Sequence, residues 1–145
     1  MIPIRRQPRP VSVLLVEDND VYAETLRLLL GSLETIEVVG RARDGLQGVD
    51  LALRLEPDAI LMDVSMPVLN GFEATRRIAA RLPGIRIVML TSSDDSADRE
   101  RARACGAVGY LTKDRGLADV VAAVTAAPER PSRARSRSLP AVACA

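Results

Sequence analysis

The chain has 145 residues, of which 48% are hydrophobic and 27% charged, and its net charge at pH 7 is +1. This length and balance fit one globular domain and exclude an overall basic footprint for nucleic acid. We expect a cytoplasmic protein without membrane contact, because no apolar run is long enough to span a bilayer and the basic N-terminus lacks a signal-peptide core.

Short apolar runs alternate with helical patterns along the chain. Strands are predicted at 11–16, 36–39, 59–62, 85–90 and 108–111. Helices are predicted from Asp20 to about Gly31, from the N-cap residue Asp44 onward, after the Asn70-Gly71 turn, over 95–104, and from Leu117 to Val124. Five strands alternating with five helices imply an α/β domain built on one parallel sheet.

Two of these helical patterns lead to specific expectations. In the second, Gln47 is placed as the capping-box partner of Asp44. The core-facing stripe of that helix is predicted to consist of Leu46, Val49 and Leu53. The fourth pattern, 95–104, is rich in Arg and Asp and has only alanines for an apolar face, which predicts a weak helix.

The regular pattern covers residues 11–127 and is flanked by segments of different character. Residues 1–10 are basic, and residues 128–145 are rich in Arg, Ser, Pro and Ala without a usable apolar period. We expect both flanking segments to be disordered.

Polar side chains follow four of the predicted strands directly. They are Glu17 with Asp18, Asp63, Thr91 with Ser92, and Thr112 with Lys113. Ligands bind at the carboxyl ends of the strands in open parallel sheets, so these groups form a candidate site. Three carboxylates brought together repel one another, and a divalent cation or a lysine resolves that conflict. Carboxylates, a metal, a hydroxyl and an ammonium also suit phosphoryl transfer, with an aspartate as nucleophile.

Two features of composition narrow the chemistry of this site. The sequence contains no histidine, which excludes Ser-His-Asp and Cys-His catalysis and His-containing zinc sites. A metal held by carboxylates alone is a hard cation such as Mg²⁺. Lys113 is the single lysine among 20 basic residues, which indicates that this position requires a compact ammonium and not a planar guanidinium.

Four stretches, each at a predicted strand end, carry a resemblance to a known family. They are Leu-Leu-Val-Glu-Asp-Asn-Asp (14–20), Leu-Met-Asp-Val-Ser-Met-Pro-Val-Leu-Asn-Gly (61–71), Val-Met-Leu-Thr-Ser (88–92) and Gly-Ala-Val-Gly-Tyr-Leu-Thr-Lys (106–113). Together they resemble the response-regulator receiver domains of two-component signalling, most closely those fused to a helix-turn-helix output domain. The resemblance implies a receiver domain over 11–127 with a flavodoxin-like (βα)5 fold, strand order 2-1-3-4-5, and helices on both faces of the sheet.

The resemblance also implies a metal site and a phosphoacceptor. Asp63 would accept a phosphoryl group from a sensor histidine kinase, a phosphotransfer protein or a small phosphodonor. Glu17, Asp18 and Asp63 would hold Mg²⁺, together with the backbone carbonyl of Ser65. The domain would be a signalling module with slow self-dephosphorylation and not an enzyme.

The remaining implied roles concern the response to phosphorylation. Thr91 and Lys113 would contact the phosphoryl oxygens, and Thr91 and Tyr110 would act as a switch pair. The switch would remodel the face made by the fourth helix, fifth strand and fifth helix, for a downstream protein or a homodimer. Cross-dimer charge pairs would come from Arg99, Arg101, Arg103 and Asp119. We expect no DNA-binding domain in this chain, and Asp114, where many receivers have proline, leaves the isomer of the 113–114 peptide open.

Three other functions compete with this one. A haloacid-dehalogenase-type phosphatase needs a second acid two residues after its nucleophile, where this chain has Ser65. A flavodoxin-like FMN binder needs a hydroxyl- and glycine-rich phosphate loop, whereas residues 17–20 are acidic. A receiver-like adaptor that is never phosphorylated stays open.

Overall fold

The computed structural model describes residues 9–126, in which strands and helices alternate. The strands are β1 (Val11–Val16), β2 (Ile36–Ala42), β3 (Ala59–Asp63), β4 (Arg86–Thr91) and β5 (Gly109–Thr112). The helices are α1 (Asp20–Gly31), α2 (Gly45–Leu55), α3 (Gly71–Arg81), α4 (Ser96–Cys105) and α5 (Leu117–Thr125). The predicted disorder of the two chain ends falls almost wholly on residues outside this described part.

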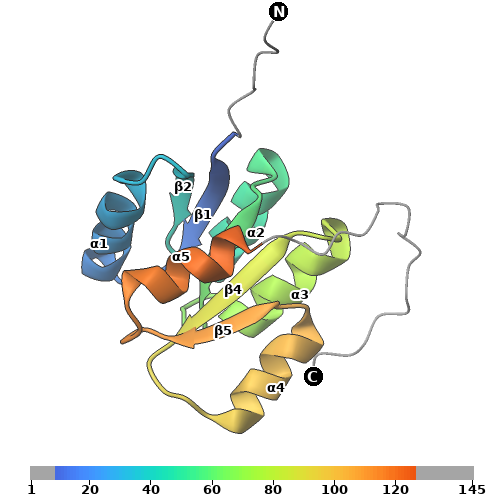
Figure 1. The fold of residues 1–145 in the computed structure, drawn as a ribbon. Helices are drawn as coiled ribbons and strands as arrows, with labels where there is room; N and C mark the ends of the chain where they lie inside the picture. Colours follow the sequence, from blue (N-terminus) through green and yellow to red (C-terminus); the bar gives the residue numbers. More distant parts are fainter. Residues whose placement is uncertain (1–8, 127–145) are drawn as a thin grey trace, which may run out of the picture.

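The five strands form one parallel sheet in the order β2-β1-β3-β4-β5, which confirms the expected fold. Helices α1 and α5 pack on one face, and α2, α3 and α4 cover the other (Figure 1). Side chains of β1, β3 and β4 are buried on both faces, which explains why their sequences are nearly continuous apolar runs. All five carboxyl ends of the strands therefore meet at one edge of the sheet.

The boundaries of four strands differ from the sequence-based prediction, by three residues at the end of β2 and by one residue at the end of β3 and at both ends of β4 and β5. Strand β2 continues three residues past the predicted end, to Ala42, because its pairing with β1 resumes after a register shift and ends at Val16↔Ala42. Strand β5 begins at Gly109, the first residue that pairs with β4, although the Val108 amide already donates a 2.8 Å hydrogen bond to the Ile87 carbonyl. An apolar run alone does not reveal where hydrogen bonding to a neighbour begins or ends.

Helix α2 meets the sheet mainly through small residues, although Val49 of the predicted stripe also packs against the core. Its buried residues are Gly45, Gly48 and Ala52. Leu46, predicted to face the core, is 50% exposed, so that prediction is wrong. A Cβ atom at Gly48 would lie only 2.8 Å from Cγ1 of Val16, so the helix backbone lies directly on β1. The Asp44 N-cap is confirmed by a 2.8 Å hydrogen bond from the Gln47 amide.

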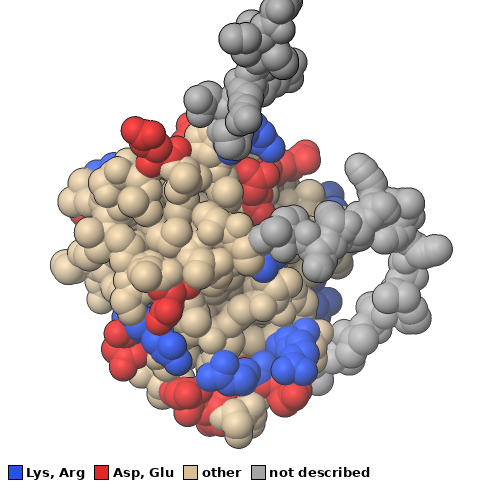
Figure 2. All heavy atoms as spheres, viewed as in Figure 1, with Lys and Arg blue, Asp and Glu red and all other residues tan. Residues whose placement is uncertain are grey.

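Helix α4 has the weak apolar face that the sequence predicts. Only Ala102 and Cys105 of this helix are buried, and five of its ten residues are charged: Asp98, Arg99, Glu100, Arg101 and Arg103. In Figure 2, charged side chains gather over α4, whereas few lie over α1 and α5. Within residues 9–126, the helices are all too short or too polar to cross a bilayer.

The loop from β3 to α3 folds back onto the end of β3. The Gly71 amide donates a 2.8 Å hydrogen bond to the carbonyl of Val64, which follows β3 directly. A Cβ atom at Gly71 would lie 2.1 Å from the backbone carbonyl oxygen of Asp63. Only glycine therefore allows helix α3 to begin this close to the end of the strand.

We predict that Gly71→Ala lowers the free energy of unfolding by about 1–3 kcal/mol, because the added methyl group forces the loop away from β3. Gly31→Ala is the matched control, since nothing lies within 4 Å of a Cβ atom at the end of α1. That substitution is expected to be neutral or to stabilise by up to about 1 kcal/mol. Urea unfolding of both variants tests this, and equal midpoints for the two would contradict it.

Candidate functional site

Three carboxylates meet where β1 and β3 end. These neighbouring strands are paired up to Val16↔Met62, so Glu17 and Asp18 emerge beside Asp63. One oxygen atom from each of the three carboxylates lies within 4.8 Å of the other two. Glu17 and Asp63 are buried, with 2% and 4% of their surface exposed, whereas Asp18 is exposed. The structure thus forms the acidic cluster that the strand ends predict.

Lys113 joins the two buried carboxylates. Its Nζ lies 3.0 Å from Glu17 Oε1, 3.2 Å from Glu17 Oε2 and 3.3 Å from Asp63 Oδ1. The ammonium also lies 4.8 Å from the centre of the Tyr22 ring, a cation–π contact that the sequence did not reveal. Burial lowers the pKa of Lys113, but its contacts with Glu17 and Asp63 outweigh this and raise the pKa overall. The lysine therefore carries its charge at neutral pH.

The carboxyl group of Asp63 has a strongly altered pKa. Burial raises it most, the nearby Glu17 carboxylate raises it further, and Lys113 opposes both, which brings the pKa of Asp63 to about 7. An ordinary aspartate ionises near pH 4, so a large part of the Asp63 population carries a proton at neutral pH. A single ammonium does not fully compensate this cluster of carboxylates.

The acidic cluster fits a divalent metal. Glu17 Oε2 accepts a 3.0 Å hydrogen bond from the Asn19 amide. Glu17 Oε1 is buried and lies near the Lys113 ammonium, yet among the described residues it accepts no hydrogen bond of good geometry. An unsatisfied carboxylate oxygen beside two further carboxylates and one lysine is a donor set that suits a hard cation such as Mg²⁺.

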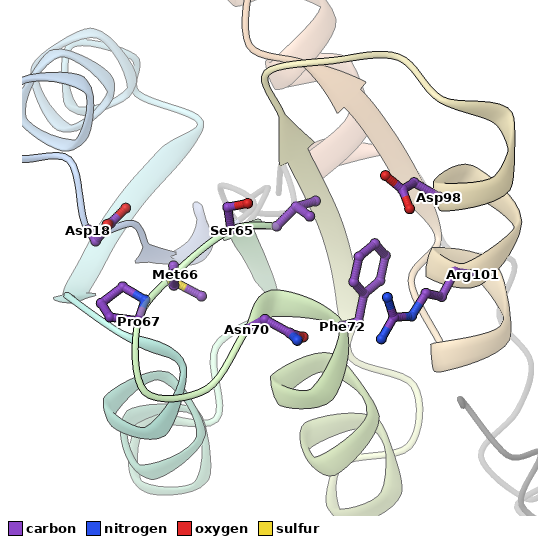
Figure 3. A pocket seen from close by; sticks show the side chains of 9 residues that line it. Asp18, Ser65, Met66, Pro67, Asn70, Phe72, Asp98 and Arg101 are labelled. Carbon is purple, nitrogen blue, oxygen red and sulfur yellow. The ribbon is translucent and has the colours of Figure 1, made fainter.

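A cavity of about 570 Å³ opens from this cluster toward α4. Asp18 and Ser65 line it on one side, and Asp98 and Arg101 of α4 line it on the other (Figure 3). The guanidinium of Arg101 lies 4.2 Å from the centre of the Phe72 ring. Ser65, whose carbonyl the sequence proposes as a metal ligand, is thus exposed at the mouth of the acidic cluster.

Thr91 and Tyr110, the predicted switch residues, lie on adjacent strands. The buried Thr91 hydroxyl donates a 3.0 Å hydrogen bond to the Ser93 carbonyl and accepts one of 3.2 Å from the Ser93 amide. Tyr110 is also buried, and its hydroxyl finds no hydrogen-bond partner within residues 9–126. Burial raises the pKa of Tyr110, with a smaller opposing effect from Thr91. The switch role of this pair stays a prediction.

The structure also answers the question of the bond after Lys113. The Lys113–Asp114 peptide is trans, as are all other peptide bonds of the described chain.

Arg41 reaches the site from β2 and was not found from the sequence. Its Nε and Nη2 atoms donate hydrogen bonds of 3.1 and 2.7 Å to the backbone carbonyl of Glu17. The third guanidinium nitrogen, Nη1, forms a 2.9 Å ion pair with Asp20. The predicted strand ends at residue 39, so the sequence does not place Arg41 on the sheet edge beside Glu17.

Comparison with known proteins assigns a family to this arrangement. Residues 13–125 match the model of the response regulator receiver domain. The transcriptional regulatory protein LnrK of Bacillus subtilis is 40% identical over 114 residues, which are 79% of this chain and 52% of LnrK. The chain spans about half the length of the curated relatives it matches.

Solved structures agree with this assignment. The signal receiver domain of the response regulator NarL from Mycobacterium tuberculosis has a TM-score of 0.77 and 28% identity, and the match covers 81% of this chain and 94% of that one. A two-component response regulator of the LuxR family from Aurantimonas has a TM-score of 0.76 and 32% identity, covering 79% of this chain and 82% of that one. These relatives confirm the resemblance seen in the sequence.

The raised pKa of Asp63 predicts how stability depends on pH without metal. Between about pH 4 and about pH 7, the folded protein binds more protons at Asp63 than the unfolded chain does, so stability from this group falls as pH rises. Asp63→Asn removes the buried charge. In EDTA, we expect Asp63→Asn to raise the free energy of unfolding at both pH values. The increase should be larger at about pH 8 than at about pH 5, by about 2 kcal/mol.

Urea unfolding at the two pH values measures this difference. Asp18→Asn is the matched control, since Asp18 belongs to the same cluster but is exposed, and its gain is expected to be smaller. A gain for Asp63→Asn that is the same at both pH values would contradict the prediction.

Proposed function

Because this chain belongs to the response regulator receiver family, we propose that it accepts a phosphoryl group on Asp63 from a sensor histidine kinase or a phosphotransfer protein. The observation that supports this most is the contact of the Lys113 ammonium with both Asp63 and Glu17, at 3.3 and 3.0 Å. A nucleophilic carboxylate, two further acids and a fixed cation at one sheet edge are the groups that phosphoryl transfer needs.

In the proposed step, a carboxylate oxygen of Asp63 attacks the phosphorus atom of the donor. The new O–P bond makes an acyl phosphate, while the N–P bond of a phosphohistidine breaks and its electron pair stays on the imidazole nitrogen. Asp63 must be unprotonated to attack, and with its pKa near 7 it is half ionised at neutral pH. Glu17, Asp18, Asp63 and the Ser65 carbonyl would hold Mg²⁺, which when bound neutralises charge on the phosphoryl oxygens.

Lys113 and Thr91 complete the proposed site. The Lys113 ammonium already touches the acceptor carboxylate, so it is placed to pair with a phosphoryl oxygen attached there. The Thr91 hydroxyl binds the Ser93 backbone in this structure, so it must exchange that partner to reach the phosphoryl group. When Thr91 changes its partner, the Tyr110 side chain would move as well, and together these movements would change the face formed by α4, β5 and α5. Water would slowly remove the phosphoryl group, so we propose a timed signalling module in the cytoplasm.

Phosphorylation would act in one of two ways. In the first, the chain forms a homodimer through that face. In the second, the face binds a downstream protein, and this chain itself does not contact DNA. The four charged residues considered for cross-dimer pairs have partners within the chain. Arg99 pairs with Asp94, Arg101 stacks on Phe72, Arg103 lies near Glu100, and Asp119 pairs with Arg115. A dimer that uses them must exchange these contacts.

The first experiment is intact mass after incubation with acetyl phosphate and Mg²⁺. We expect one phosphoryl group on the wild-type protein, none without Mg²⁺, and none on Asp63→Asn. Asp18→Asn, which keeps the acceptor, should be modified more slowly because it loses one proposed metal ligand. If the folded wild-type protein stays unmodified both here and with a panel of histidine kinases, the unphosphorylated adaptor becomes the better explanation.

Dimer formation is tested by sedimentation with and without a phosphoryl mimic. We expect a monomer alone and a dimer with the mimic, and Asp63→Asn should stay monomeric in both conditions. An unchanged monomeric mass of the wild-type protein with the mimic bound would rule out this output and leave a downstream protein.

A further inference from the structure

We propose that Arg41 is a positioning residue for the metal-binding acids, an inference that rests on the function proposed above. Its guanidinium holds the peptide between Glu17 and Asp18 from the side of β2. Arg41 would thereby set the affinity for Mg²⁺ without contacting the metal or the phosphoryl group.

The contact is specific to the shape of arginine. Nε and Nη2 both donate to the Glu17 carbonyl, at 3.1 and 2.7 Å, and Nη1 pairs with Asp20 at 2.9 Å. Three nitrogen atoms of one planar group thus bind both ends of the turn from β1 into α1. The Arg41 side chain is 20% exposed, so these bonds are partly shielded from water. A lysine has a single ammonium and cannot reproduce this fork.

The carbonyl that Arg41 binds belongs to the peptide that joins the two acids. The Glu17 amide on the other side donates a 3.0 Å hydrogen bond to Ala42, so β2 holds Glu17 at both of its backbone groups. Asp18 follows directly and is exposed, so its place depends on the orientation of this peptide. Groups that orient metal ligands from behind typically change metal affinity by 10–100-fold when they are removed.

Arg43 offers a matched control in the same segment. Its Nη1 also forms an ion pair with Asp20, and its side chain is 60% exposed. The hydrogen bonds found for the described residues place Arg41, but not Arg43, on the Glu17 carbonyl. Removing either arginine deletes one positive charge near the acids, which by itself strengthens the binding of a cation. Only loss of positioning weakens it, so the two effects have opposite signs.

The experiment measures Mg²⁺ affinity of the full chain by calorimetry, with amide NMR shifts of residues 17–19 as a second readout. We expect Arg41→Met to raise the dissociation constant by about tenfold, and Arg41→Lys by less, since it keeps one donor and the charge. Arg43→Met should change the constant by less than about twofold, toward tighter binding. All titrations are done well below the unfolding temperature of each variant, so that a loss of stability alone leaves the affinity unchanged.

The outcomes separate this inference from the proposed function. A wild-type protein that binds no Mg²⁺ would overturn the proposed function, and this inference with it. If the wild-type protein binds Mg²⁺ while Arg41→Met and Arg43→Met behave alike, the inference alone is wrong. Should Arg41→Met fail to fold, Arg41→Lys and Arg43→Lys form the decisive pair, and equal affinities for those two would overturn the inference.

Discussion

The site is built around the cost of placing two like charges in a low-dielectric environment. Glu17 and Asp63 end adjacent strands and are almost completely buried, and Lys113 reaches both of them across the sheet edge. One ammonium leaves this cluster negative, and the raised pKa of Asp63 shows that this carboxyl group holds its proton more tightly. The cluster is therefore destabilising alone and becomes favourable with a cation. In the function proposed above, affinity for a metal and the readiness of Asp63 to receive a phosphoryl group would both come from this uncompensated negative charge.

The position of the site residues at the ends of buried strands could be predicted from the sequence. An abrupt change from an apolar run to a charged residue shows where a strand ends at the edge of the sheet. Glu17, Asp63 and Lys113 were found in this way, although no pattern states that one lysine would contact both acids. Arg41 and Leu46 were missed or misplaced for a different reason. Edge-strand pairing extended β2 past its apolar run, and glycines let α2 pack on β1 through its backbone. Both depend on neighbours in space, which periodicity along one segment does not encode.

The two sides of the site are anchored unequally. On the β1 side, the backbone of Glu17 is bound by β2 at its amide and its carbonyl, so the acids rest on the edge of the sheet. On the β4 side, the Thr91 hydroxyl binds its own loop, and α4 beyond it buries only two residues. Such a helix separates from the core at low cost. In the function proposed above, this contrast between a firmly held acidic side and a loosely packed helix is what would let phosphorylation of Asp63 change a distant surface.

The tyrosines give this molecule an optical property that follows from its composition. The chain has no tryptophan and only two tyrosines, so tyrosine emission is not masked by a stronger fluorophore. Tyr22 lies against the Lys113 ammonium at the acidic cluster, and Tyr110 lies on β5 under the Arg99 guanidinium. One chromophore thus lies at the proposed phosphorylation site and the other on the strand proposed to take part in the response. Native tyrosine fluorescence can therefore observe both positions without an added label.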